Sequence, residues 1–112
     1  SIKEVLGHMA DTERIMSYRL LRVGRGDQTP LAGFNENNYI AAANFETLSI
    51  KQIIEDFTAV RKATITLVNN MAEEAWERTG VANNSDITTR ALAYIIAGHA
   101  LHHLNIINER YL

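Results

Sequence analysis

The segment between Ser49 and Met71 holds the feature that most restricts the fold, an apolar stripe with helical spacing. Its apolar residues recur every three or four positions, as on one face of an α-helix. They are Ile50, Ile53, Ile54, Phe57, Val60, Leu67, Val68 and Met71. Ser49 and Gln52 match a capping box, so this helix is predicted to start after Ser49 and to run to about Met71. A helix of this kind needs other helices to cover its apolar face.

Residues 1–23 form the second predicted helix. Ser1 and Glu4 give another capping-box pattern, and apolar residues again recur with helical spacing. The connection that follows contains the only proline of the chain, several asparagines and three glycines within its first ten residues. This connection has about two dozen residues. Connections of that length are usually functional or folded into short helical turns. Phe34 and Tyr39 in this connection indicate that it packs against the helices.

The third predicted helix closes the chain. It begins near Thr88, with Ser85 and Asp86 as alternative caps, and continues almost to Leu112. Residues 72–87 before it are predicted to form a short helical turn and a polar loop. No strand pattern stands out. The sequence therefore predicts an all-α, up-down-type helical bundle with three long helices and short turns.

Composition limits the classes of protein to which the chain can belong. Its 112 residues suffice for one domain, residues 1–112, with an ordinary hydrophobic fraction of 46%. The net charge of −2 gives no attraction to nucleic acid, and no apolar run approaches the roughly 18 residues of a membrane span. We therefore expect neither nucleic acid nor a membrane as a partner. Cysteine is absent, which agrees with a cytoplasmic location and leaves histidines and carboxylates as metal ligands.

Three of the four histidines lie on the last predicted helix. His99 and His103 are four residues apart in the middle of its apolar stripe, and His102 lies near the edge of that stripe. An i,i+4 histidine pair can hold one divalent cation, and catalytic zinc commonly takes three protein ligands. The remaining histidine is His8. Spacing alone leaves a second interpretation open, in which these are hydrogen-bonded core histidines. The His-Glu-x-x-His motif of zinc proteases is absent.

Arg61 is a charged residue inside an apolar stripe, only about 40° from Phe57 around the helix. An unpaired buried charge is costly, so Arg61 needs a partner. Glu13 or Asp11 could neutralise it, or it could hold an anionic substrate. We favour a structural ion pair.

The segments "LGHMADTERIMSYRLLRVGRGDQTPLAGF" and "TTRALAYIIAGHALHHLNIINERYL" resemble the DinB/YfiT-like superfamily of metal-binding four-helix bundles, and "FTAVRKATITLV" is similar to its third helix. The resemblance implies a metal triad of His8, His99 and His103. It also implies a divalent metal, with zinc or nickel favoured over other iron-group metals. His102 is then a neighbour of the site.

Two other residues are candidates for supporting roles. Asp11, about one turn from His8, could accept a hydrogen bond from a ligand imidazole, although a solvated carboxylate is an equal alternative. Tyr39 could line the substrate pocket, although an aromatic anchor for the connection is the more common role.

Members of this superfamily carry another long helix before the segment that corresponds to Ser1. We therefore expect this chain to lack the N-terminal helix of the bundle, and we expect a homodimer. The resemblance implies a metal-dependent transferase that joins a low-molecular-weight thiol, such as bacillithiol or mycothiol, to a small-molecule electrophile, or a related hydrolase. Without cysteine, the thiol must come from a cosubstrate. The other hypothesis is a non-catalytic helical module for metal binding or dimerisation.

Overall fold

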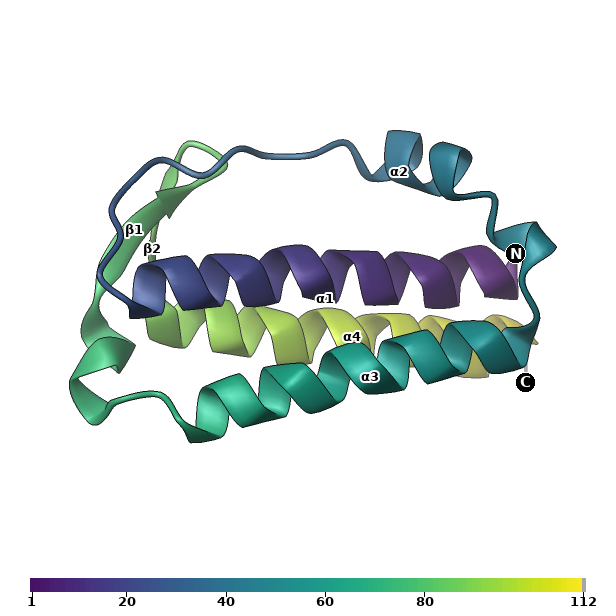
Figure 1. The fold of residues 1–112 in the computed structure, drawn as a ribbon. Coiled ribbons are helices and arrows are strands. Elements are labelled where there is room, and N and C mark those ends of the chain that lie inside the picture. Colours follow the sequence, from purple (N-terminus) through teal and green to yellow (C-terminus); the bar gives the residue numbers. More distant parts are fainter. Residues whose placement is uncertain (112) are drawn as a thin grey trace.

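Three long helices dominate the computed structural model of the chain, which describes residues 1–111 (Figure 1). They are α1 (Ile2–Gly24), α3 (Ile50–Asn69) and α4 (Thr89–Tyr111). The three predicted long helices are thus confirmed, with ends close to those expected. In the part of the chain that the structure describes, no helix is both long and apolar enough to cross a membrane.

Side-chain caps explain where the helices begin. Ser1 caps α1 together with Glu4, and Ser49 caps α3 together with Gln52, so both predicted capping boxes are present. At α4, the hydroxyl oxygen of Thr88 accepts a hydrogen bond from the backbone N–H of Ala91 at 3.0 Å. This cap places the start of α4 at Thr89, and the alternative caps at positions 85 and 86 lie in a strand instead.

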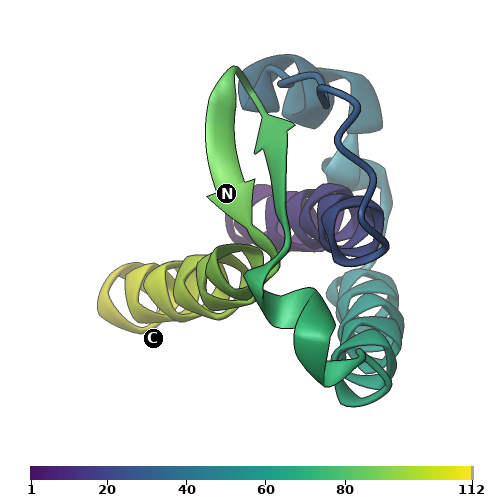
Figure 2. The same cartoon turned by 90° about the vertical axis from the view of Figure 1, so that its left-hand side faces the viewer.

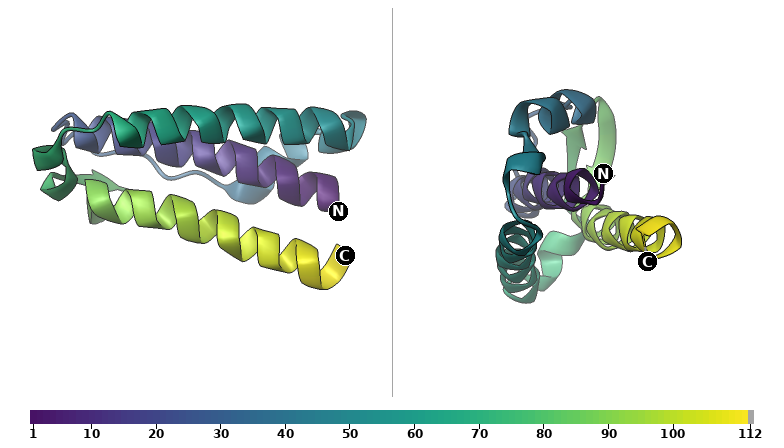
Figure 3. Two further views of the ribbon diagram at one scale, coloured as in Figure 1. Left: turned by 90° about the horizontal axis from the view of Figure 1, so that it is seen from below. Right: turned by 90° about the vertical axis from the view of Figure 1, so that its right-hand side faces the viewer.

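Helix α1 is the central element of the bundle and packs against both α3 and α4 (Figure 3). The connection after α1 returns along the helix, so α1 and α3 run in the same direction and α4 runs in the opposite one (Figure 1). This connection contains the short helix α2 (Glu36–Ala43) and the 3₁₀ turn η1 (Phe45–Thr47). The expected short helical turns are confirmed, and α2 lies over the side of α1 that faces away from α3.

A close contact fixes the end of this connection beside the start of α1. The ring of Phe45, which is buried, lies so near Gly7 that a Cβ atom on Gly7 would be 2.4 Å from it. Only glycine permits this approach without a shift of the ring or the helix. Because Gly7 precedes His8, the same contact helps to hold α2 above the first turns of α1.

The structure corrects the prediction that the chain has no strand. Residues Thr79–Ala82 (β1) and Ser85–Thr88 (β2) form an antiparallel hairpin, which follows the 3₁₀ turn η2 (Glu73–Glu77) (Figure 2). Asn83 and Asn84 form the two-residue turn with φ values of 50° and 65°. Asparagine tolerates this left-handed conformation, which favours a tight hairpin turn. The strands are too short to give a clear alternating pattern in the sequence.

The hairpin also forms hydrogen bonds with the connection at Leu31. The backbone N–H of Leu31 donates to the carbonyl of Val81 at 2.8 Å, and the N–H of Asn83 donates to the carbonyl of Leu31 at 2.9 Å. These bonds hold residues 30–34 along α1. The connection is thus anchored near Leu31 at one end of α1 and near Phe45 at the other.

The apolar core consists of two clusters along the helices. The larger cluster contains the buried residues Leu20, Val23, Met71, Ala75, Leu92 and Ile96. The smaller cluster, at the other end of the α1–α4 contact, contains Met9, Ala100 and Ile107. Met9 and Ala100 are the sequence neighbours of His8 and His99, so the histidines lie beside the smaller cluster.

Candidate metal centre

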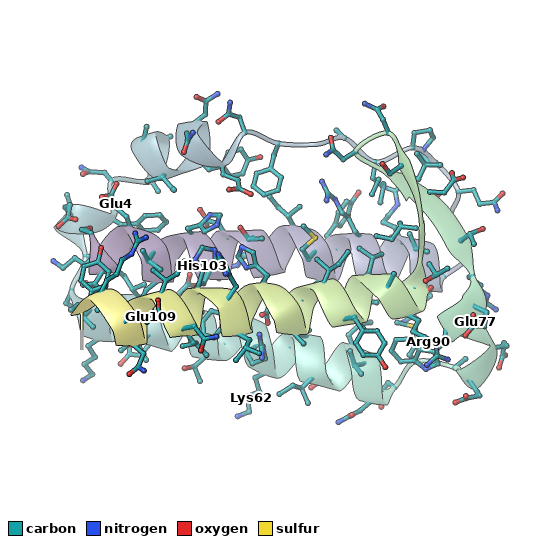
Figure 4. All side chains as sticks on the ribbon, turned by 180° about the vertical axis from the view of Figure 1, so that it is seen from behind. Glu4, Lys62, Glu77, Arg90, His103 and Glu109 are labelled. Carbon is teal, nitrogen blue, oxygen red and sulfur yellow. The ribbon has the colours of Figure 1, made fainter. Side chains whose placement is uncertain are left out.

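Three histidine side chains converge between α1 and α4. His8 comes from α1, and His99 and His103 come from consecutive turns of α4. The Nε2 atom of His99 lies 3.3 Å from that of His8 and 3.1 Å from that of His103. Each ring offers one nitrogen such that all three atoms lie within 4.8 Å of one another. Figure 4 shows His103 in the region where α4 faces α1.

The nitrogen positions match the dimensions of a metal site. Two nitrogens bound to one zinc at tetrahedral geometry, with bonds of 2.0–2.1 Å, are separated by about 3.3 Å. The two measured Nε2 separations, 3.3 and 3.1 Å, agree with that value. A neutral imidazole has one donor and one acceptor nitrogen, so hydrogen bonds cannot pair three converging Nε2 atoms completely. The donor set therefore fits a divalent cation.

The surroundings keep the rings of His99 and His103 uncharged. Burial lowers the pKa of His99 to about 4, with further lowering by the neighbouring His103, His8 and His102. Burial is also the main cause that lowers the pKa of His103. At neutral pH these two imidazoles are therefore neutral, which is the form that binds metals.

Thr12 orients the ring of His8. The Thr12 hydroxyl lies 3.3 Å from Nδ1 of His8, and the two residues are 2% and 7% exposed. When Nδ1 donates its hydrogen to this hydroxyl, the lone pair on Nε2 points toward His99. Thr12 therefore occupies the role that we considered for Asp11. Within residues 1–111, Asp11 makes no hydrogen bond to a histidine, and burial raises its pKa.

A carboxylate that the sequence analysis missed faces the same site. Oε2 of Glu36, at the start of α2, lies 3.9 Å from Nε2 of His8. An open cavity of about 400 Å³ lies beside them, lined by Ser1, Glu4, Val5, His8, Glu36, Asn37, Ile40 and His103. Neither periodicity nor spacing links Glu36 to the histidines, because it reaches them only through the path of the connection. His102 is exposed, with its ring centre 5.1 Å from that of His103.

Arg61 forms the expected structural ion pair, and its partner is Glu13. The Nη2 atom of Arg61 donates to Oε1 of Glu13 at 2.6 Å, and Nε donates to both carboxylate oxygens. Glu13 is 3% exposed, and its hydrogen bond raises the pKa of Arg61. This pair joins α1 to α3.

Tyr39 does not line the cavity beside the histidines. Its ring centre is 5.0 Å from that of Phe34, and the two residues line a second cavity between the connection and α1. Tyr39 is 45% exposed. It thus packs against Phe34, as an aromatic anchor of the connection would, and the pocket that it lines is not the one beside the histidines.

Comparison with known proteins gives one informative result. No significant match was found among curated proteins or among solved structures. The sequence profile of the DinB superfamily, in contrast, matches residues 1–107 and so includes all of the histidines described above. This match covers nearly the whole sequence, and the chain belongs to the DinB superfamily.

Proposed function

We propose that this protein binds a divalent metal through the Nε2 atoms of His8, His99 and His103 and acts as a metal-dependent enzyme on a small molecule. The observation that supports this most strongly is the convergence of three ring nitrogens, two pairs of which are separated by 3.3 and 3.1 Å, as suits one cation. Zinc or nickel fits three imidazoles, and other iron-group metals share this preference. The adjoining open cavity leaves room for a substrate.

His8, His99 and His103 would hold the metal, which would act as a Lewis acid and lower the pKa of a thiol or water beside it. The residues of the chain then have separate tasks. His8, His99 and His103 hold the cation, and Thr12 fixes the ring of His8. The Glu36 carboxylate, 3.9 Å from Nε2 of His8, is positioned to accept the proton that the substrate thiol or water releases.

Thiol transfer to an electrophile is the reaction that we favour, with hydrolysis as the related possibility. Both need a nucleophile with a lowered pKa next to a proton acceptor, and the cavity beside Glu36 supplies the same groups for either. The chain has no cysteine, so a thiol must arrive as a low-molecular-weight cosubstrate. Conjugation therefore requires the cavity to admit both the thiol and the electrophile.

The second candidate function is a non-catalytic module for metal binding or dimerisation. Large exposed apolar side chains on α3 and α4 favour it: Ile65 is 50% exposed, Leu101 61% and Leu104 51%. Contiguous exposed apolar surface is typical of interaction sites, and a homodimer would cover it. The two candidate functions differ in whether metal removal changes a reaction or only the assembly.

The deciding experiment is metal analysis of untagged protein by inductively coupled plasma mass spectrometry. Wild type and the matched control His102→Ala are expected to carry one divalent metal per chain, whereas His8→Ala and His99→Ala lose it and keep their circular dichroism spectra. Wild type that never takes up metal, or triad variants that retain it, would refute the metal site. Unfolding on metal loss would favour the structural module.

Reaction class is tested separately with the metal-loaded protein. A panel of small thiols with a chromogenic electrophile should give conjugation that stops on chelation and is slower in Glu36→Gln. Turnover of chromogenic esters without thiol would assign hydrolysis instead. No turnover of either kind across the panels would leave the non-catalytic module as the better proposal.

A further inference from the structure

Arg19 is a buried cation without an acidic partner. It lies on α1 and is only 6% exposed. Its guanidinium donates one hydrogen bond of 2.9 Å to the carbonyl of Ala32 and makes a weaker contact of 3.8 Å with the sulfur of Met16. None of the ion pairs found within residues 1–111 includes Arg19.

This arrangement is costly unless an anion completes it. A guanidinium has five N–H donors in a planar fork, and the two contacts above use only part of that capacity. Burial lowers the pKa of Arg19, yet arginine stays charged at every physiological pH. A buried charge is ordinarily paired, as Arg61 is with Glu13.

A cavity of about 360 Å³ opens beside Arg19, between α1 and the connection. This volume lies within the usual range for small-molecule sites. The lining is largely apolar and aromatic: Ile15, Tyr18, Pro30, Leu31, Phe34 and Tyr39 accompany Arg19, Arg22, Ala32 and Gly33. The centre of the Phe34 ring lies 5.9 Å from the Arg19 guanidinium carbon. The cavity thus combines aromatic and apolar walls with polar groups, among them the guanidinium of Arg19.

The second arginine of the cavity is already neutralised. Nε of Arg22 donates to a carboxylate oxygen of Asp27 at 2.5 Å, and Arg22 also donates to the hydroxyl of Tyr18. The hydrogen bonds from Arg22 and from Thr29 lower the pKa of Asp27 to about 2, so this carboxylate stays ionised. One uncompensated positive charge, that of Arg19, therefore remains in the cavity.

The structure assigns to this cavity a binding site for the carboxylate of a small organic anion, and we propose Arg19 as its anchor. The planar fork of arginine matches the two oxygens of a carboxylate. The single positive charge suits a monoanion better than a phosphate dianion, and the aromatic walls suit an apolar group attached to the carboxylate. The carbonyl of Ala32 holds the guanidinium in place for this contact.

The position of Arg19 connects this site to the histidines. Eleven residues separate it from His8, which puts both side chains on nearly the same face of α1, about 16 Å apart along the axis. An elongated substrate could place its carboxylate at Arg19 and its reacting group near His8. This last step rests on the proposed function, whereas carboxylate binding at Arg19 does not.

Nuclear magnetic resonance of the ¹⁵N-labelled chain tests the proposal directly, because the Nε–Hε group of arginine gives its own signal. Benzoate is the probe, and inorganic phosphate is the competitor of different chemistry. Benzoate is expected to shift the Arg19 Nε–Hε signal and the Gly33 and Phe34 amides, in zinc-loaded and in metal-free protein alike. An unmoved Arg19 signal, or phosphate binding more tightly than benzoate, overturns the proposal.

Variants separate a binding role from a structural one. Arg19→Met should weaken benzoate binding about tenfold or more, since a hydrogen bond to a charged group contributes about 1.5–3 kcal/mol. Arg14→Gln is the matched control, because it removes an exposed arginine of the same helix and should change the affinity less than about twofold. Equal affinity in wild type and Arg19→Met overturns the proposal.

Two further variants keep the test decisive. If Arg19→Met fails to fold, Arg19→Lys retains the charge without the fork and should still bind benzoate several-fold more weakly than wild type. Unchanged affinity in a folded Arg19→Lys overturns the bidentate contact. His99→Ala should bind benzoate as wild type does, so loss of the metal site leaves this result intact. Benzoate signals confined to the histidines of zinc-loaded protein refute the Arg19 site.

Discussion

Two polar clusters are buried against α1, and they differ in whether their charges and lone pairs are satisfied. Glu13 and Arg61 form a complete ion pair, in which three hydrogen bonds connect the guanidinium to the carboxylate. His8, His99 and His103 instead direct their Nε2 atoms toward a common point. Both clusters interrupt an apolar surface between helices.

The difference indicates what each cluster can do. In the Glu13–Arg61 pair the two charges neutralise each other, so the pair joins two helices and no ligand is needed to explain it. The histidine cluster brings three Nε2 atoms together, and hydrogen bonds among them cannot satisfy all three. Unsatisfied polar atoms in an interior are uncommon, so this cluster is the place to expect a bound group.

The largest expected effect concerns the histidine cluster, because its lone pairs are not satisfied. His99→Ala should weaken zinc binding by more than about 100-fold, beyond the 10–100-fold typical for residues that only support a ligand. Zinc at about 100 times its dissociation constant should stabilise wild type by about 2.7 kcal/mol and His99→Ala by no more than about 0.4 kcal/mol. Titration calorimetry and thermal melts measure both. An equal zinc-induced shift in the two proteins would contradict the comparison.

Substitutions in the Glu13–Arg61 pair are expected to change the stability of the fold. Arg61→Met leaves the Glu13 carboxylate buried without its partner, and it should lower the free energy of unfolding by about 2–3 kcal/mol, because Arg61 is partly exposed. The double variant Glu13→Leu with Arg61→Met should recover most of this loss. Urea unfolding measures each. A single variant as stable as wild type would show that the pair contributes little.

The sequence predicts the long helices well because their signals are local. Capping residues and three-to-four spacing act within one helix, and Ser49 with Gln52 placed the start of α3 correctly. The histidines of α4 could be paired for the same reason, since one helical turn separates His99 from His103. His8 joined them only through the family resemblance, because no local rule brings two distant helices together.

Local sequence patterns do not predict the contacts that involve the connection between α1 and α3. Glu36 approaches His8 because Phe45 packs on Gly7 and directs the path of α2. Arg19 was not singled out, since an arginine on an amphipathic helix is ordinarily exposed, and its burial depends on the segment around Ala32. The hairpin was missed because its strands are short. In each instance, long-range packing decides the outcome.

The pH dependence of metal-free protein sharpens the comparison. The folded state lowers the pKa of His99 from 6.5 to about 4, so between these values the unfolded chain binds more protons. Stability should therefore fall as the pH is lowered through this window and should change no further through His99 below about 4. Between pH 6.5 and 5, we expect the free energy of unfolding to fall by less than it does in Arg61→Met, because the ring of His99 is partly exposed.

Urea unfolding of chelator-treated protein at several pH values measures this dependence above the range in which most carboxylates titrate. His99→Ala should show a shallower fall in stability than wild type. His102→Ala, whose ring is exposed, is the control and should follow wild type closely. A wild-type curve as flat as that of His99→Ala would mean that burial does not affect this histidine.

The smallest expected effect comes from a second ion pair between α1 and α3. Arg14 donates to both carboxylate oxygens of Asp56, at 2.8 and 2.5 Å, and these hydrogen bonds lower the pKa of Asp56. Like Arg61, Arg14 reaches both oxygens of its partner, although through its two terminal nitrogens, and the side chains of this pair are 52% and 44% exposed. Water and salt screen it, so Asp56→Asn should cost less than about 1 kcal/mol.

Salt distinguishes the two ion pairs. The loss in Asp56→Asn should largely disappear at about 1 M sodium chloride, where the screening length is about 3 Å, whereas the loss in Arg61→Met should persist because Glu13 is buried. Urea unfolding at low and high salt compares the variants with wild type. Equal salt sensitivity of the two losses would mean that burial does not distinguish the Glu13–Arg61 pair from the Arg14–Asp56 pair.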